Sequence, residues 1–396
     1  MSTEYRISSG WKVVQIILAL FFAVLSVILM AGVGVRKAGP IVLLVGLCFL
    51  AVAILIIYRS FSRVITADED SLRYYNGFTQ KELAFNDLKG YRIEGGRYKW
   101  LRLISNTDSQ LNIRIGDYSN FGNIDELMRS IQNRCGDLDL ADKAQETQTL
   151  LHEDRLGESE AERARALQTA KVIAIIYNVG GFALLLLLTV SSRWIFLGPL
   201  IHPLIGLIVM ATSKGLIRLY ANPRRSAIQT LVIGFTVPCF LLLFTGFGNY
   251  DILHYASLWL PSLLVGIVLF VLLYVFGFNK TAEAIAAQLI VMVVFALIYG
   301  VGVITHLNGA LDDTPGQVYE TSVAARHVTH GRSTSYYVQL SPWGPVHGYQ
   351  EESVHRSFYN SVNIGDTVEV VLHPGWMHIP WYRIRKPVTI ITPLLR

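Results

Sequence analysis

Seven long apolar runs constrain this chain more than any other feature. A membrane-spanning helix needs about 20 apolar residues, because each rises about 1.5 Å and the hydrocarbon core is about 30 Å thick. Charged residues make up only 16% of the 396 residues, where a soluble domain carries about 25%. The sequence therefore predicts a membrane α-helical protein with about seven transmembrane helices, and excludes disorder and a secreted disulfide scaffold. The runs are residues 13–35, 41–58, 172–190, 194–212, 227–247, 256–278 and 284–305.

The positive charges near the run ends predict an orientation. Segment 213–226 carries four Lys or Arg residues and no acid, whereas segment 248–255 carries no Lys or Arg. Cytoplasmic loops carry the excess of Lys and Arg, so we expect the first segment inside and the second outside. The N-terminus is then inside and segment 306–396 outside, in a bacterial cytoplasmic (inner) membrane. The pair Arg36-Lys37 opposes this assignment but is outweighed.

The segment between the second and third runs changes to short alternating strands followed by one helix. Strands are expected within 64–75 and in several short stretches up to Ile115, and a helix over 124–134. This order resembles a bacterial pleckstrin-homology-like domain over about 59–135. The motifs that carry the resemblance are Gly77-Phe78-Thr79-Gln80-Lys81, Phe85-Asn86-Asp87-Leu88 and Asn123-Ile124-Asp125-Glu126-Leu127. Bacterial domains of this class often bind proteins, so the resemblance implies a contact module rather than phosphoinositide binding.

A cluster of basic residues marks this inserted domain as a candidate contact surface. Such a patch on anionic lipid headgroups contributes about 1 kcal/mol per basic residue near the membrane surface. The alternative is a solvated strand edge, on which Lys and Arg block aggregation. The candidate residues for headgroup or partner contact are Lys89, Arg92, Arg97, Lys99 and Arg102.

The C-terminal segment alternates between polar and apolar residues and predicts a small all-β barrel or sandwich. Strands are expected near 317–326, 335–340, 367–372 and 381–384. The stretch from Phe358 to Val370, followed by His373-Pro374-Gly375 and Pro380-Trp381-Tyr382, is similar to a small β domain of unknown function in bacterial membrane proteins. That resemblance covers about 70 residues and implies no chemistry.

Six of the ten histidines lie between residues 327 and 378 of this segment, which raises the question of a metal site. Zinc needs three or four converging ligands, and residues three apart on a strand point to opposite faces. Scattered surface histidines are therefore the simpler interpretation, and a pH-sensing role is a further alternative. The weak metal candidates are His327, His330, His373 and His378.

The domain plan predicted from these patterns has five parts. They are a transmembrane hairpin 1–58, a pleckstrin-homology-like domain 59–135, an amphipathic linker helix 136–171, a five-helix transmembrane bundle 172–305, and an extracytoplasmic β domain 306–396. The middles of the runs lack Asp, Glu, Lys and Arg, which disfavours ion-coupled transport.

No catalytic signature or cofactor motif occurs in the sequence, so no cofactor and no nucleic-acid partner are expected. These features favour a non-catalytic integral membrane protein that binds protein partners on both sides of the bilayer, as a scaffold, sensor or immunity protein. Two alternatives stay open: an uncoupled channel or facilitator, and a membrane enzyme with a histidine-containing external site.

Overall fold

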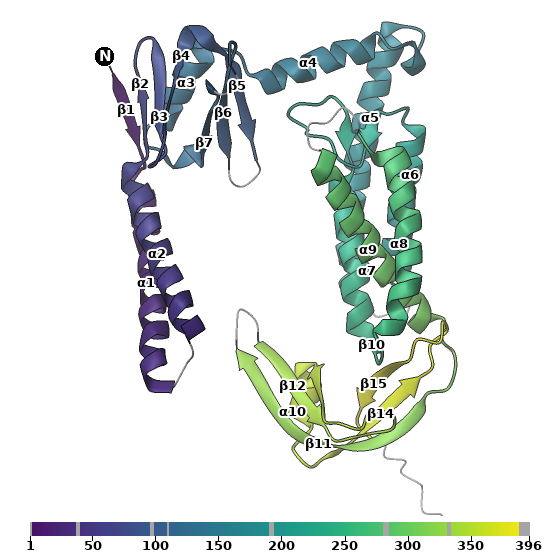
Figure 1. Cartoon of the computed structure of the whole chain (residues 1–396). Coiled ribbons are helices and arrows are strands. Elements are labelled where there is room, and N and C mark those ends of the chain that lie inside the picture. The colour runs from purple at the N-terminus through teal and green to yellow at the C-terminus, as the bar shows by residue number, and fades with distance from the viewer. Residues whose placement is uncertain are drawn as a thin grey trace, which may run out of the picture. The chain divides into compact units, whose positions relative to one another are not determined.

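The computed structural model describes residues 2–36, 40–95, 99–108, 111–189, 194–279, 285–330 and 334–387. Contacts divide the chain into two compact units (Figure 1). The N-terminal unit comprises Met1–Thr149 together with the three residues Arg224–Ser226, and the C-terminal unit comprises Leu150–Pro223 and Ala227–Arg396. Each unit is described by itself.

A hairpin of two long apolar helices opens the N-terminal unit. Helices α1 (Ser9–Arg36) and α2 (Pro40–Ser62) lie side by side. The Ser26 hydroxyl donates to the carbonyl of Gly46 at 2.7 Å, so one polar group inside the hairpin is satisfied. Most other apolar side chains along both helices face outward and are exposed. A helix that is apolar on its outer faces suits a lipid environment.

Two antiparallel sheets and one helix complete the N-terminal unit, and all of their elements except β1 follow the hairpin. The first sheet has the order β1-β2-β3-β4 and the second the order β5-β6-β7. Helix α3 (Ile124–Arg134) buries Leu127 and Ile131 in the core between them. The strands are β1 (Thr3–Arg6), β2 (Val64–Ala67), β3 (Ser71–Tyr75), β4 (Gln80–Ala84), β5 (Leu88–Glu94), β6 (Trp100–Ser105) and β7 (Ile113–Gly116).

The stretch predicted as one linker helix is built from three pieces. Helix α4 (Leu138–Leu151) is followed by a short 3-10 turn, Asp154–Leu156, and then by α5 (Glu160–Ala183). The Ser159 hydroxyl accepts a hydrogen bond from the Glu162 amide, so it caps α5 at the position that the sequence indicates. Helix α5 therefore runs without a break from the polar linker into the third apolar run.

Five helices form the bundle of the C-terminal unit. They are α5, α6 (Leu197–Thr212), α7 (Val232–Asn249), α8 (Ala256–Gly277) and α9 (Ile285–Ala310). One continuous apolar cluster, which includes Tyr177, Phe235, Leu273 and Tyr299, fills the space between them.

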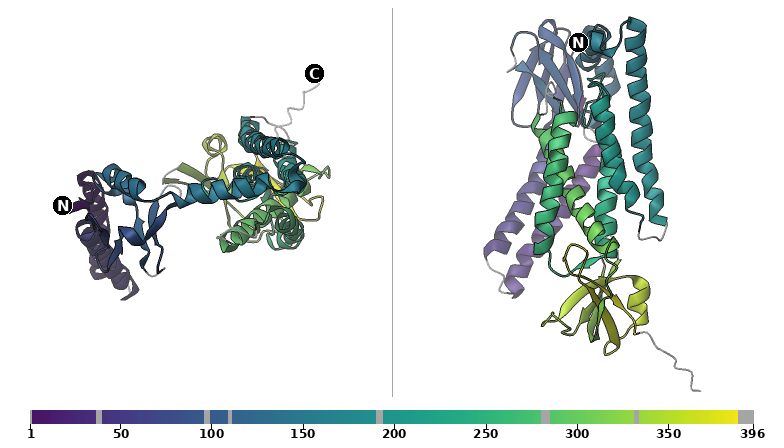
Figure 2. Two further views of the ribbon diagram at one scale, coloured as in Figure 1. Left: turned by 90° about the horizontal axis from the view of Figure 1, so that it is seen from above. Right: turned by 90° about the vertical axis from the view of Figure 1, so that its right-hand side faces the viewer.

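A strongly curled antiparallel sheet lies at one end of this bundle (Figures 1 and 2). Its strand order is β10-β15-β14-β11-β12-β13, and β10 comes from the loop between α7 and α8. The long strand β11 pairs with β14 over its first half and with β12 over its second half, and a register shift between Val323 and Ala325 bends it there. The elements are β10 (Asp251–Ile252), β11 (Gln317–His330), β12 (Thr334–Leu340), β13 (Gln350–Val354), α10 (Arg356–Ser361), β14 (Thr367–His373) and β15 (Trp381–Arg385).

The mixed architecture of apolar helices with a curled C-terminal β half-barrel agrees with the sequence prediction, but the helix count differs. Within the described ranges, six helices are long and apolar enough to cross a membrane. The fourth run, 194–212, forms the shorter helix α6, whose 16 residues span about 24 Å at about 1.5 Å each, less than the hydrocarbon core. Its described part begins with a turn at Trp194, and α6 starts at Leu197, so the helix is shorter than the apolar run.

Candidate functional sites

The basic residues singled out in the sequence lie on and beside two neighbouring strands. Lys89 and Arg92 lie on β5, Lys99 precedes β6, and Arg102 lies on β6 opposite Arg92. Arg97 lies outside the described residues. Their role in headgroup or partner contact stays a prediction.

Two of these cations take part in ion pairs that the sequence analysis missed. Arg92 contacts Asp142 at 2.7 Å, and Arg102 contacts Glu94 at 3.4 Å. The same region of the N-terminal unit includes Arg225, which contacts the buried Asp139 at 2.6 Å. Asp139 and Asp142 are about 40 residues away from these strands along the chain. A count of charges over the strands alone therefore includes Glu94 but not these two acids. The cluster is thus partly neutralised rather than a free basic surface.

A cavity of about 400 Å³ lies where the helical hairpin meets the sheets of the N-terminal unit. Three arginines and one aspartate line it: Arg59, Arg63, Arg114 and Asp117. Arg59 and Arg63 are not among the candidate residues identified from the sequence. The two arginines are four residues apart at the end of the second apolar run. This spacing predicts that their side chains lie on the same face of a helix, and it could have identified the pair.

The four candidate metal-binding histidines are distributed over the β domain. His327 stacks on Tyr337 and lies 3.9 Å from a carboxylate oxygen of Glu351, while His330 ends β11. His373 stacks on Trp381 with ring centroids 4.2 Å apart. His378 has a left-handed backbone conformation, with φ of 58°. Among the described residues, no group of three or more His, Cys, Asp or Glu side chains is arranged to hold a metal ion.

A partly buried polar cluster joins strands β13 and β15 in the same domain. The Tyr382 hydroxyl donates to Glu352 and accepts from the Gln350 amide at 2.7 Å, and the Gln350 oxygen accepts from the Trp343 indole at 3.1 Å. Burial raises the pKa of the Glu352 carboxyl, and burial also raises the pKa of Asp251, against the opposing effect of Arg383. The β domain thus contains two partly buried carboxyls whose pKa values are raised.

The end of helix α9 is fastened to the β domain by hydrogen bonds. Asn308 is fully buried; its amide nitrogen donates to the Ile379 carbonyl at 2.8 Å and its oxygen accepts from the Met377 amide at 3.0 Å. The Asp312 carboxylate accepts from the Gly375 amide and from the Trp381 indole, at 2.8 and 3.1 Å. We call this set of contacts the α9 junction.

A shared apolar cluster reinforces the α9 junction. Buried side chains from the bundle and the β domain pack together there, among them Tyr250, Leu258, Ile304, Ile379 and Trp381. Tyr250 and Trp381 meet edge to face at 5.0 Å. Hydrogen bonds and apolar packing therefore join the β domain and the bundle into one body.

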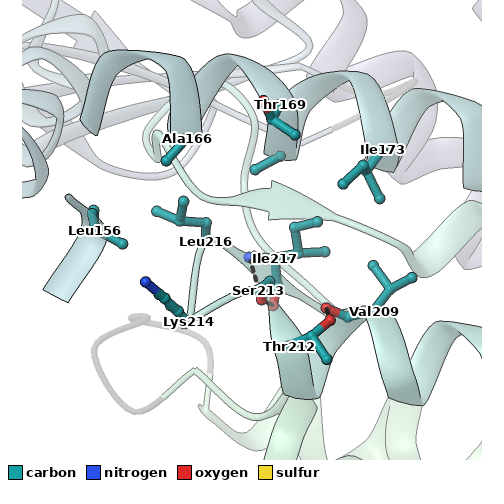
Figure 3. A pocket seen from close by; sticks show the side chains of 11 residues that line it. Leu156, Ala166, Thr169, Ile173, Val209, Thr212, Ser213, Lys214, Leu216 and Ile217 are labelled. Atoms are coloured by element: carbon teal, nitrogen blue, oxygen red, sulfur yellow. Dashed lines mark hydrogen bonds between the residues drawn. The ribbon is translucent and has the colours of Figure 1, made fainter. Parts of the chain in front are cut away.

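A second cavity, of about 280 Å³, lies between α5, α6 and the turn that follows α6 (Figure 3). Its walls are mainly apolar, with Leu156, Ile173 and Val209 among them, and Lys214 lies at one side. The Lys214 ammonium donates to the carbonyl of Arg155 at 2.8 Å. This cavity therefore has one charged group, which already has a protein partner.

No family model, no curated protein and no solved structure matches this chain.

Proposed function

We propose that this chain is a non-catalytic multi-pass protein of a bacterial cytoplasmic membrane that binds protein partners on both sides of the bilayer, as a scaffold, sensor or immunity protein. The observation that carries the proposal is the α9 junction. A module that is hydrogen-bonded through the buried Asn308 to a long apolar helix moves with that helix. A partner bound to the β domain would therefore act directly on the helix bundle.

Exposed large apolar side chains on the β domain support a contact surface. Tyr349, Ile364 and Trp376 are each more than half exposed. Aromatic residues of this kind are enriched in the buried centres of protein interfaces.

In the N-terminal unit, we propose that β2 to β7 and α3 form a pleckstrin-homology-like contact domain on the cytoplasmic side, to which β1 adds an edge strand.

Site-specific photo-crosslinking in cells tests the proposal. A crosslinking residue in place of Tyr349 or Trp376 in the full chain is expected to give a discrete protein adduct after gentle detergent extraction. The matched control replaces Leu260, an exposed residue of the apolar helix α8, which is expected to give no such protein adduct. Absence of a stoichiometric adduct at both β-domain positions would contradict the proposal.

A further inference from the structure

The cavity at the base of the helical hairpin has an excess of positive charge. It is lined by Arg59, Arg63 and Arg114 against a single acid, Asp117, with Gln15 and Trp100 completing its polar and aromatic wall. All of these residues belong to the N-terminal unit. They are different residues from the basic cluster on β5 and β6 that was identified in the sequence.

Arg63 is the most informative of these residues, because its charge is buried without a countercharge. The residue is only 8% exposed. Its guanidinium donates to the Tyr74 hydroxyl at 3.3 Å and to the carbonyl of Gly116, which are both neutral acceptors. Across the described part of the chain, no carboxylate lies within ion-pair distance of Arg63. The guanidinium also lies 5.2 Å from the centroid of the Phe121 ring, which offsets part of its desolvation cost. A buried cation whose partners are all neutral retains the rest of that cost, so the site favours an added anion.

The other polar groups that line the cavity also offer positive charge or hydrogen-bond donors to an anion. Arg114 stacks over the Trp100 ring at 4.3 Å and makes a long contact of 3.4 Å with Glu94. Arg59 is exposed at the last turn of α2. The Gln15 side-chain oxygen is buried without a hydrogen-bond partner in the described structure. Since the two ends of an amide are assigned from their surroundings, Gln15 can present its donor end to an anion.

The cavity lies at the end of the apolar hairpin, where helix α2 enters the sheet. The Tyr58 hydroxyl donates to the carbonyl of Gly77 at 2.6 Å, which fixes the β3–β4 turn to the helix. Phe78 in that turn packs on Tyr58 and is otherwise largely exposed. In a membrane-inserted hairpin, an exposed aromatic pair at a helix end lies at the depth of the lipid headgroups.

We propose that this cavity binds a phosphate group. Guanidinium groups present a planar fork of donors that matches phosphate oxygens, and a buried arginine is the preferred partner for such an anion. The headgroup of an anionic phospholipid and a soluble phosphate ester share this chemistry. The inference concerns a small ligand and does not depend on the protein partners proposed above.

Binding is measured on the full chain purified in a neutral detergent, in two arms. In the first arm the chain is titrated calorimetrically with glycerol phosphate. In the second arm it is exposed to mixed micelles that contain phosphatidylglycerol or, as a control, phosphatidylcholine, and retained lipid is counted by native mass spectrometry. Saturable binding in at least one arm is expected, and the arm that responds identifies the source of the phosphate.

Variants tie the binding to the cavity. Arg59→Gln and Arg114→Gln are each expected to weaken binding about fivefold, the effect of about one basic residue at a membrane surface. Arg63→Lys keeps the charge but loses the fork of donors, and is also expected to weaken binding while thermal unfolding reports that the chain is folded. The matched control Arg129→Gln removes an exposed charge on α3 that does not line the cavity, and should leave binding unchanged.

Three results would overturn the inference. They are the absence of saturable binding in both arms, an equal loss of binding in Arg129→Gln and the cavity variants, and equal retention of phosphatidylcholine and phosphatidylglycerol together with no binding of glycerol phosphate.

Discussion

Individual side chains in the β domain make its stability depend on pH. Glu352 accepts a hydrogen bond from Tyr382, and burial nevertheless raises the pKa of its carboxyl. Below the unfolded-state pKa of about 4, the carboxyl is protonated in both the folded and the unfolded chain. As the pH rises through the raised folded-state value, the folded chain must ionise a buried group. The free energy of unfolding therefore falls with rising pH over that window.

Replacement of Glu352 tests this pH dependence. Glu352→Gln keeps an acceptor for Tyr382 but does not ionise, so its stability is expected to fall less than that of the parent between pH 4 and pH 7. The difference amounts to about 1.4 kcal/mol for each unit by which the folded pKa is raised. Thermal unfolding in detergent at several pH values measures it. Glu351→Gln, at the exposed neighbouring position, is the control, and parallel curves for the parent and Glu352→Gln would contradict the expectation.

A single buried amide holds the α9 junction together. Asn308→Ala removes the donor to Ile379 and the acceptor for Met377 and leaves both backbone groups without that partner. Unsatisfied buried groups cost about 1–3 kcal/mol each. The variant is expected to expose the β domain to limited proteolysis at a protease concentration that leaves the parent intact. Asn363→Ala, on an exposed loop of the same domain, should behave like the parent; equal resistance of all three chains would argue against the junction.

At the scale of elements, glycines set the distance between α8 and α9. A Cβ added at Gly300 would lie 2.2 Å from the Ser262 carbonyl oxygen, and one added at Gly266 would lie 2.9 Å from the Ala296 oxygen. Small residues at such positions let helix backbones approach closely within a membrane. Neither helix can accept a methyl group here without moving.

Gly300→Ala is therefore expected to destabilise the bundle by about 1–3 kcal/mol, the usual cost of overpacking. The midpoint of thermal unfolding in detergent measures the effect. Gly248→Ala adds the same methyl group where no atom lies within 4 Å, and should leave the midpoint nearly unchanged. A midpoint for Gly300→Ala equal to that of Gly248→Ala would show that the two helices do not approach as closely as described.

The N-terminal strand β1 ties the start of the chain into the first sheet. Tyr5 is buried against the core of the N-terminal unit and is paired with Ile65 of β2. Tyr5→Ala is expected to destabilise this unit by about 3 kcal/mol, as for the truncation of a large buried aromatic residue. Urea unfolding of the full chain, followed by hydrogen exchange of β2 and β3, measures the loss. Unchanged protection of β2 in the variant would contradict the role of β1.

Local patterns predict some of these elements well. The helices of the apolar runs and the helix Ile124–Arg134 depend on neighbouring residues, and each is present. Strand β1 was missed because four residues before an apolar run show no periodicity of their own, and pairing with β2 brings them into a sheet. Strand β10 was missed for the same reason.

The candidate sites depended on contacts between distant residues, and the sequence predicted them less well. Asp139 is 46 residues from Ile93 and 86 residues from Arg225, the two groups that donate to its carboxylate. Asn308 is 71 residues from Ile379, whose carbonyl accepts from its amide. Charge counting over a short window does not bring such groups together. Hydrophobic and turn patterns therefore predict elements, whereas long-range polar contacts have to be seen in the structure.

At the scale of the whole molecule, the proposed function requires a defined orientation in a membrane. The apolar helices are compatible with a membrane location. The positively charged segment 213–226 favours a cytoplasmic position for itself and for the β sheets of the N-terminal unit, and an external position for the C-terminal β domain. This orientation requires that the short helix α6 crosses the bilayer as well as the six long helices, which a local thinning of the bilayer permits.

Fusion of a reporter enzyme that is active only outside the cytoplasm tests this orientation most directly. One fusion joins the reporter to the C-terminus of the full chain, and the other joins it after residue 149. Activity is expected from the C-terminal fusion, and silence from the fusion after residue 149. Silence from the first together with activity from the second would contradict this orientation.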